Sequence, residues 1–265
     1  MNTFLLGVAV IGGIIAVAIS GLLLVRAKCD IRQFSAHHEV GGYMLSVLGT
    51  LYAVVLGFVV VSVYESAQNI RVNIASEVNS VMNIYRLSDG FPQKNKEQID
   101  NALLNYLTTV CNEEWINMAS GKIPVSTIHA GENIWQSIKD YVPQTPQQQS
   151  FYSLLLENYS QMLNCQRIRF IGAHDQVSTL LWVVLIGGAA TTIGFTFFFG
   201  LDKLGPQILM TTLVCIALGL NLLLIVIYSR PFSGDLGIRP AEFRIAAEFI
   251  RNKGRLPPKL LQLAP

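Results

Sequence analysis

Four stretches of the chain are apolar or weakly polar and contain no charged residue. They cover residues 2–25, 40–64, 178–201 and 204–229. Each is long enough to cross, as a helix, the roughly 30 Å hydrocarbon core of a bilayer. The first stretch exceeds the apolar core of a signal peptide, and no basic residue precedes it. We therefore expect it to be retained as a membrane span.

The second apolar stretch begins a longer periodic segment, from about residue 41 to 88. No proline occurs before Pro92, and no glycine lies between Gly57 and Gly90. One helix of roughly 70 Å is therefore predicted, which crosses a membrane and projects beyond it. Its projecting half has an apolar stripe that needs partner helices, at Ala67, Ile70, Ile74, Val78, Val81 and Tyr85. The opposite face is expected to be solvated, at Gln68, Arg71, Asn73, Glu77 and Asn79.

The segment between the second and third spans shows helical periodicity and no alternation typical of strands. Helices are expected over 96–120, 127–142 and 151–175, with a turn containing two prolines before the last. A short helix is expected from Pro240, lying on lipid headgroups or docked on the bundle. The sequence thus predicts an all-α polytopic membrane protein with four transmembrane helices and an extramembrane helical bundle. Its parts are 1–64 (spans one and two), 65–177 (bundle), 178–229 (spans three and four) and 230–265 (basic tail).

Small residues form a stripe along the second span, at Gly42, Ser46, Gly49, Ala53 and Gly57. Two interpretations remain open. Such a stripe allows close packing between helices. It can also line a pore around a symmetry axis, where a hydrophobic constriction gates by dewetting.

In the fourth span, Asn221 is an intramembrane amide for which we expect an interhelical hydrogen bond or, less commonly, a role as an ion ligand.

Composition restricts the possible functions. Charged residues make up 14% of the chain, the net charge is +2, and the mean hydropathy is +0.43, so a lipid bilayer is the expected partner and nucleic acid is not. No span carries an Asp, Glu, Lys, Arg or His at mid-depth, which argues against a proton-coupled pump. The pair Glu113 and Glu114 is expected to face solvent, and Arg167 and Arg169 are expected to meet lipid headgroups or anions.

Motifs of nucleotide-binding loops, nucleophile elbows and zinc proteases do not occur in the sequence. An enzyme is therefore the least supported class, and no catalytic residue, cofactor or metal site is expected. The four cysteines lack metal-type spacing. A Cys111–Cys165 disulfide requires an oxidising compartment, and free thiols are the favoured alternative.

Several segments resemble the bestrophin-like family of unknown function, a group of mostly bacterial four-span membrane proteins. They are GTLYAVVLGFVVVSVYESAQ (49–68), EVNSVMNIYRLSDGFP (77–92), LWVVLIGGAATTIGFTFFFG (181–200) and SRPFSGDLGIRPAEF (229–243). The resemblance implies a remote kinship with bestrophins, which are pentameric anion channels with a helical soluble region. The sequence has no run of acidic residues like the calcium-binding clasp of bestrophins, so the resemblance implies no calcium site in this chain. A channel role is at this point an analogy at the level of the fold.

Two functional hypotheses follow. The first is a homo-oligomeric ion channel, anion-selective by analogy, in which the stripe from Gly42 to Gly57 lines the pore. The alternative is a membrane-anchored sensor or interaction protein whose helical bundle binds a partner. Both place the chain in the cell membrane, which is the inner membrane in a Gram-negative cell. Orientation stays open, because basic residues flank the spans on both sides, including Arg26 and Lys203 on one side and Arg239 on the other.

Overall fold

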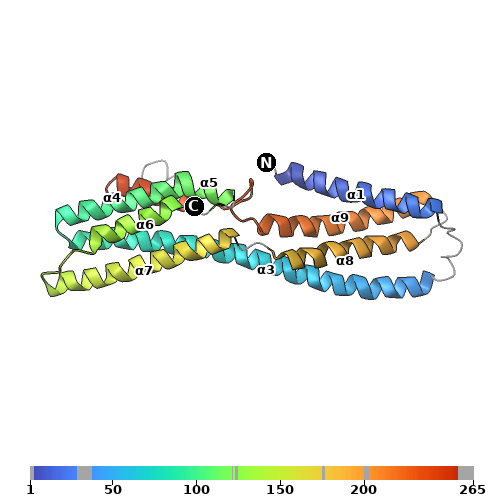
Figure 1. The fold of residues 1–265 in the computed structure, drawn as a ribbon, viewed down its shortest axis with the longest axis horizontal. Helices are drawn as coiled ribbons and strands as arrows, with labels where there is room; N and C mark the ends of the chain where they lie inside the picture. The colour runs from blue at the N-terminus through green and yellow to red at the C-terminus, as the bar shows by residue number, and fades with distance from the viewer. Residues whose placement is uncertain are drawn as a thin grey trace. The chain divides into compact units, whose positions relative to one another are not determined.

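The computed structural model describes residues 3–28, 38–120, 122, 125–174, 177–199 and 203–255. Within these residues every regular element is a helix, which confirms the predicted all-α class. The helices form two compact units (Figure 1). The first, called the membrane unit below, comprises Met1–Ser66, Gln176–Arg230 and Gly234–Leu236. The second, called the bundle unit, comprises Ala67–Asp175, Pro231–Ser233 and Gly237–Pro265.

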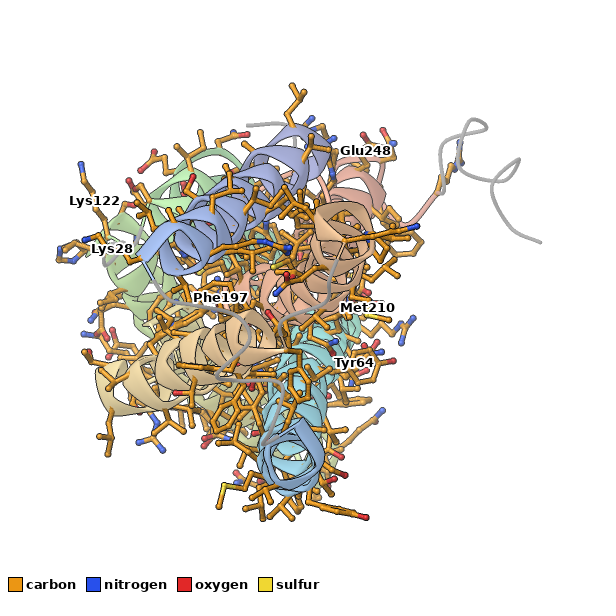
Figure 2. All side chains as sticks on the ribbon, turned by 90° about the vertical axis from the view of Figure 1, so that its right-hand side faces the viewer. Lys28, Tyr64, Lys122, Phe197, Met210 and Glu248 are labelled. Carbon is orange, nitrogen blue, oxygen red and sulfur yellow. The ribbon has the colours of Figure 1, made fainter. Side chains whose placement is uncertain are left out.

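The membrane unit contains the four predicted spans. They are α1 (Thr3–Lys28), the first part of α3 (His38–Leu87), α8 (Thr179–Phe198) and α9 (Leu204–Tyr228). All four are long and apolar enough to cross a membrane. Only 11 to 22% of the most apolar window of each span is buried inside the chain. Most of this surface, including the side chain of Met210 (Figure 2), therefore faces lipid or another chain.

Close contacts in the membrane unit depend on glycine. A Cβ atom added at Gly7 of α1 would lie 2.7 Å from Leu223 of α9, and one at Gly219 of α9 would lie 3.0 Å from Ile11. Phe197 of α8 lies toward α1 (Figure 2), where it packs against Gly21. Without these glycines the helix backbones could not approach so closely, as is typical of helix packing in membranes.

A second contact in the membrane unit joins α3 to α8. The buried side chains of Tyr52, Leu56 and Val59 on α3 pack with Leu185 and Ala189 on α8. Tyr52 Oη donates a hydrogen bond to the main-chain oxygen of Leu185 at 2.6 Å. The tyrosine ring fits because the facing residue of α8 is a glycine. A Cβ atom at Gly188 would lie 2.3 Å from this ring.

The bundle unit is built on the second half of α3. After α3 come a 3-10 turn, η1 (Ser88–Gly90), then α4 (Gln93–Thr109), a π-helical segment, η2 (Val110–Glu114), and α5 (Trp115–Ala119). The remaining helices are α6 (Val125–Ile138), α7 (Pro146–His174) and α10 (Ala241–Arg251). The helix α7 begins five residues before its predicted start, inside the expected turn, because proline is well accommodated in a first turn.

The core of the bundle unit includes the short tail helix α10. Phe243 is fully buried, and Ala246, Ala247 and Ile250 lie in the same core as Leu103 of α4. Trp115 of α5 packs on Phe243 and donates its indole N–H to the main-chain oxygen of Ile238 at 2.8 Å. Of the two expected positions of the tail helix, docking on the bundle is therefore the one found.

Candidate functional site

Most of the small-residue stripe of α3 is unpacked within the chain. Ser46, Ala53 and Gly57 are exposed, and Gly42 and Gly49 are half-buried. A Cβ atom added at Gly49 or Gly57 would meet no atom within 4 Å. The face of α3 that packs on α8 is the one carrying Tyr52, Leu56 and Val59. The stripe is therefore accessible to a second copy of the chain or to lipid, and pore lining and helix packing both remain hypotheses.

Asn221, the predicted intramembrane polar residue, is half-buried on α9. Its amide Nδ2 donates a hydrogen bond to the main-chain oxygen of Ala217, one turn earlier in the same helix, at 2.9 Å. This bond satisfies one donor of the amide inside the helix. A hydrogen bond to another helix, or a role as an ion ligand, remains a prediction.

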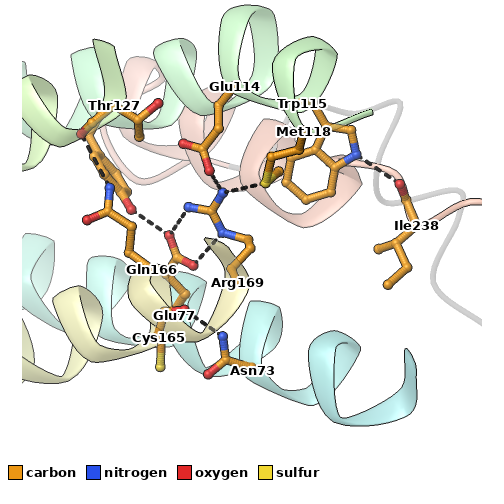
Figure 3. Close-up of polar contacts among 11 residues, drawn as sticks. Asn73, Glu77, Glu114, Trp115, Met118, Thr127, Cys165, Gln166, Arg169 and Ile238 are labelled. Carbon is orange, nitrogen blue, oxygen red and sulfur yellow. Dashed lines mark hydrogen bonds and ion pairs between the residues drawn. The ribbon is translucent and has the colours of Figure 1, made fainter. Parts of the chain in front are cut away.

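The main polar site of the bundle unit is a cluster of four side chains, Glu77, Tyr106, Glu114 and Arg169, called the charge cluster below. All four are fully buried. Arg169 donates through Nε and Nη2 to the two carboxylate oxygens of Glu77, at 2.8 Å each (Figure 3). Tyr106 Oη donates to Glu77 Oε1 at 2.5 Å. Nη1 of Arg169 forms an ion pair with Glu114 Oε1 (Figure 3).

Two of these side chains lie on α3 and α7, at positions that continue the regular spacing of buried residues along each helix. Glu77 lies at the spacing of the buried residues Ile70, Ile74, Val81 and Ile84, that is, on the apolar stripe. Arg169 continues the buried series of α7, which comprises Leu155, Tyr159, Met162 and Gln166. Periodicity alone therefore contained a signal for both residues, namely a charge at a core position.

The π-helical segment η2 carries the second carboxyl group of the charge cluster, that of Glu114. Along α4 and η2, Leu103, Leu107, Val110 and Glu114 follow one another at spacings of four, three and four, and all are buried. A π-helical turn inserts one residue into the helical repeat and is frequent at functional sites. Here the buried Glu114 ends η2, while its neighbour Glu113 is exposed.

Aromatic rings enclose the guanidinium of Arg169. Its carbon Cζ lies 5.3 Å from the ring centre of Phe243, 5.4 Å from that of Phe170 and 5.9 Å from that of Trp115. Such contacts favour a cation when it is removed from water. Burial lowers the pKa of Arg169, but the charge and hydrogen bonds of Glu77 outweigh burial, and the pKa lies above its ordinary value. The guanidinium is therefore positively charged.

Tyr106 is held as a neutral hydroxyl. Burial, followed by the neighbouring charge of Glu77, raises the pKa of Tyr106 well above its ordinary value. The hydroxyl proton is accordingly retained and donated to Glu77. The same region contains Cys165, whose pKa is raised by burial and by the charge of Glu77, so its thiol is protonated.

Three sequence-based expectations were wrong at this cluster. Glu77 and Glu114 were expected to face solvent, and Arg169 was expected to meet headgroups or anions, but all three are buried. A lone charge is excluded from a core, whereas charges that pair with one another can be buried together. The partners Glu77 and Arg169 are 92 residues apart, so the sequence did not reveal the pairing. Glu113 is exposed, as expected, and Arg167 is exposed as well, so its contact with headgroups or anions stays a prediction.

The described cysteines are unpaired and belong to no group of metal-type ligands. Cys111, Cys165 and Cys215 are free thiols, so the Cys111–Cys165 disulfide is not formed in this structure. Cys29 lies outside the described residues. Over the part of the chain that the structure describes, no three His, Cys, Asp or Glu residues are grouped as metal ligands would be.

One apolar pocket lies in the membrane unit between α1, α8 and α9. Its volume is about 640 Å³, and its walls include Leu6, Gly21, Trp182, Phe197 and Leu222. This volume falls in the range of about 300–1,000 Å³ that is usual for small-molecule sites. Its lining residues carry no charge. It can therefore accept a lipid acyl chain or an apolar side chain, but it offers no ionic group to orient a ligand.

A comparison with protein families identifies the chain. The model of the Bestrophin-like domain matches residues 12–243, which cover most of the first span, the other three spans and most of the bundle unit. The chain belongs to the bestrophin-like family. This assignment confirms the resemblance found in the sequence and fits a multi-pass membrane protein. Comparison with curated proteins and with solved structures finds no match.

Proposed function

We propose that this bestrophin-like protein assembles into a homo-oligomeric ion channel of the cell membrane, selective for anions. The observation that carries the proposal is the unpacked small-residue face of α3, together with membership of the family. Gly49 and Gly57 have free space beside them although α3 packs closely on α8 at another face. In an oligomer this free face is available to surround a central axis.

The chemistry of the stripe supports passive conduction. Its five residues, Gly42, Ser46, Gly49, Ala53 and Gly57, carry no titratable side chain. Small side chains leave room for a pore and expose helix backbone, and an apolar constriction can gate by dewetting. Proton-coupled transport usually needs a relay of Asp, Glu, His, Lys or Arg at membrane depth, and the spans carry none of these residues there.

Ion flux through vesicles containing the purified protein tests this proposal. Gly49→Leu and Ala53→Leu place bulky side chains on the proposed lining, and we expect each to lower chloride flux at least severalfold. Val54→Leu is the matched control, because Val54 is exposed on the same helix turn but lies off the stripe. Unchanged flux in both stripe variants, with normal assembly, would contradict the proposed lining.

A membrane-anchored interaction protein is the second candidate. Several large apolar side chains of the bundle unit are exposed, among them Val72 on α3, Ile116 on α5 and Ile171 on α7. Exposed apolar residues can form part of a partner-binding surface. Assembly without ion flux, combined with partner binding that Ile171→Asp abolishes and Val54→Leu leaves intact, would favour this candidate over the channel.

A further inference from the structure

The charge cluster contains one more acidic than basic side chain. Two carboxyl groups, those of Glu77 and Glu114, share the single guanidinium of Arg169, and none of the three is exposed. If both glutamates were ionised, a net charge of −1 would lie in the core. An uncompensated buried charge is strongly unfavourable, and a titratable group in that situation becomes neutral instead.

The two carboxyl groups differ in their hydrogen bonds. Glu77 accepts hydrogen bonds from Arg169 Nε, Arg169 Nη2 and Tyr106 Oη, so both of its carboxyl oxygens have donors. Glu114 meets only Nη1 of Arg169, and its Oε2 is buried with no hydrogen-bond partner among the described residues. Glu114 therefore has much less to stabilise a negative charge (Figure 3).

We propose that the charge cluster is a proton-binding site and that the folded bundle unit holds one proton on Glu114. The cluster then contains one carboxylate, one guanidinium and two neutral groups, Tyr106 and Glu114, and its net charge is zero. Protonation also turns a buried acceptor-only group into one that can donate as well as accept.

Groups on the surrounding elements do not supply a compensating charge. Besides Glu114, the ionisable groups in or next to the charge cluster are Glu77 on α3, Tyr106 on α4, Cys111 on η2, and Arg169 and Cys165 on α7. Arg244 of α10 acts on Cys111 and is exposed to solvent. On α5 the groups that contact Arg169 are the uncharged Met118 and Trp115, and on α6 the main-chain oxygen of Thr127 accepts a hydrogen bond from Gln166 of α7. Arg169 is therefore the cluster's only buried positive charge in the described ranges.

Proton binding makes the stability of the bundle unit depend on pH. An unfolded glutamate ionises at about pH 4.3, whereas buried glutamates are known that retain their proton up to about pH 8–9. Between these limits the folded state binds one proton more than the unfolded state. The stabilisation from this proton is fully present below about pH 4.3. As the pH rises above that value the stabilisation is lost, and the folding equilibrium constant falls by up to about tenfold per pH unit.

Thermal unfolding of the full chain in detergent, from about pH 5 to about pH 9, tests this prediction. We expect the unfolding temperature of the wild type to fall with rising pH and that of Glu114→Gln to fall less, so that the variant becomes the more stable at the alkaline end. Glu113→Gln is the matched control, because Glu113 is exposed, and it should follow the wild type. Identical pH dependence in all three proteins would overturn the proposal.

An infrared measurement decides the question even if Glu114→Gln does not fold. The wild type at neutral pH should show the carbonyl stretching band of a protonated carboxylic acid, which shifts in deuterium oxide. Burial raises the pKa of Asp100, so Asp100→Asn tests whether that carboxyl group gives the band; this variant should retain it. A wild-type spectrum without the band, or a band that disappears with Asp100→Asn, would overturn the assignment to Glu114.

Discussion

Arg169 is the residue on which the buried polar interactions of the bundle unit depend. Its guanidinium binds both oxygens of Glu77, pairs with Glu114 and lies against three aromatic rings. Removing one member of a buried ion pair leaves the other charge without compensation. The loss is commonly about 3–5 kcal/mol, far more than that of a surface charge.

The first residue-scale prediction follows from this difference. Arg169→Met should lower the free energy of unfolding of the bundle unit by about 3–5 kcal/mol, because Glu77 loses its counter-charge. Arg167→Met, two residues away on an exposed position, should change it by no more than about 0.5 kcal/mol. Thermal or denaturant unfolding of the two purified variants measures both changes in the free energy of unfolding. Equal stability of the two would mean that the cluster does not stabilise the fold.

At the scale of elements, α3 and α8 are held together by a tyrosine that fits against a glycine. Gly188 faces the ring of Tyr52, whereas a Cβ atom at the adjacent Gly187 would meet nothing within 4 Å. Two neighbouring glycines thus differ completely in their surroundings, which their sequence does not indicate. The pair provides a matched test of the packing between these two spans.

Gly188→Val should separate α3 from α8 locally and break the hydrogen bond from Tyr52 to Leu185. Overpacking of this kind typically costs about 1–3 kcal/mol. Gly187→Val should leave the stability of the single chain nearly unchanged. Unfolding in detergent compares the two variants. If Gly187→Val alone impaired assembly, this residue would instead contact another copy of the chain.

The tail helix α10 is a second element whose contribution can be measured. Phe243 is fully buried in the bundle core, and Ile245, two residues later, is 40% exposed. Phe243→Ala should destabilise the bundle unit by about 3–5 kcal/mol, because it leaves a cavity among large side chains. Ile245→Ala should have a much smaller effect. Comparable losses from both substitutions would contradict the docking of α10 through Phe243.

At the scale of the whole molecule, the four spans bury little of their apolar surface within one chain. At most 22% of the most apolar window of any span is buried. Lipid alone can cover this surface. The unpacked small-residue face of α3, however, is the kind of surface through which helices associate in membranes. Assembly into a homo-oligomer is therefore the expected state.

Subunit stoichiometry tests this expectation directly. Native mass spectrometry, or light scattering corrected for bound detergent, should give four or more subunits in mild detergent, because a central pore needs a closed ring of helices. A monomer or dimer would confine any pore to a single chain of four spans. That result would favour the interaction-protein candidate.

The sequence by itself determined the four spans, the continuous helix α3 and the helical class of the bundle. These features depend on local properties, namely the length of apolar stretches, the absence of helix-breaking residues and the helical repeat of apolar positions. The structure and the family comparison confirmed them without changing their order.

The tertiary structure alone decided which charged side chains pair with one another in the core and which helix faces are packed. Glu77 and Glu114 are buried because Arg169, distant in the sequence, completes the cluster. The helix α10 is packed in the bundle because Phe243 fits into the core that the other helices form. Likewise, Gly188 packs and Gly187 does not because Tyr52 of another helix faces only one of them. Each outcome depends on which partner side chain comes to lie opposite, a property that local patterning does not encode.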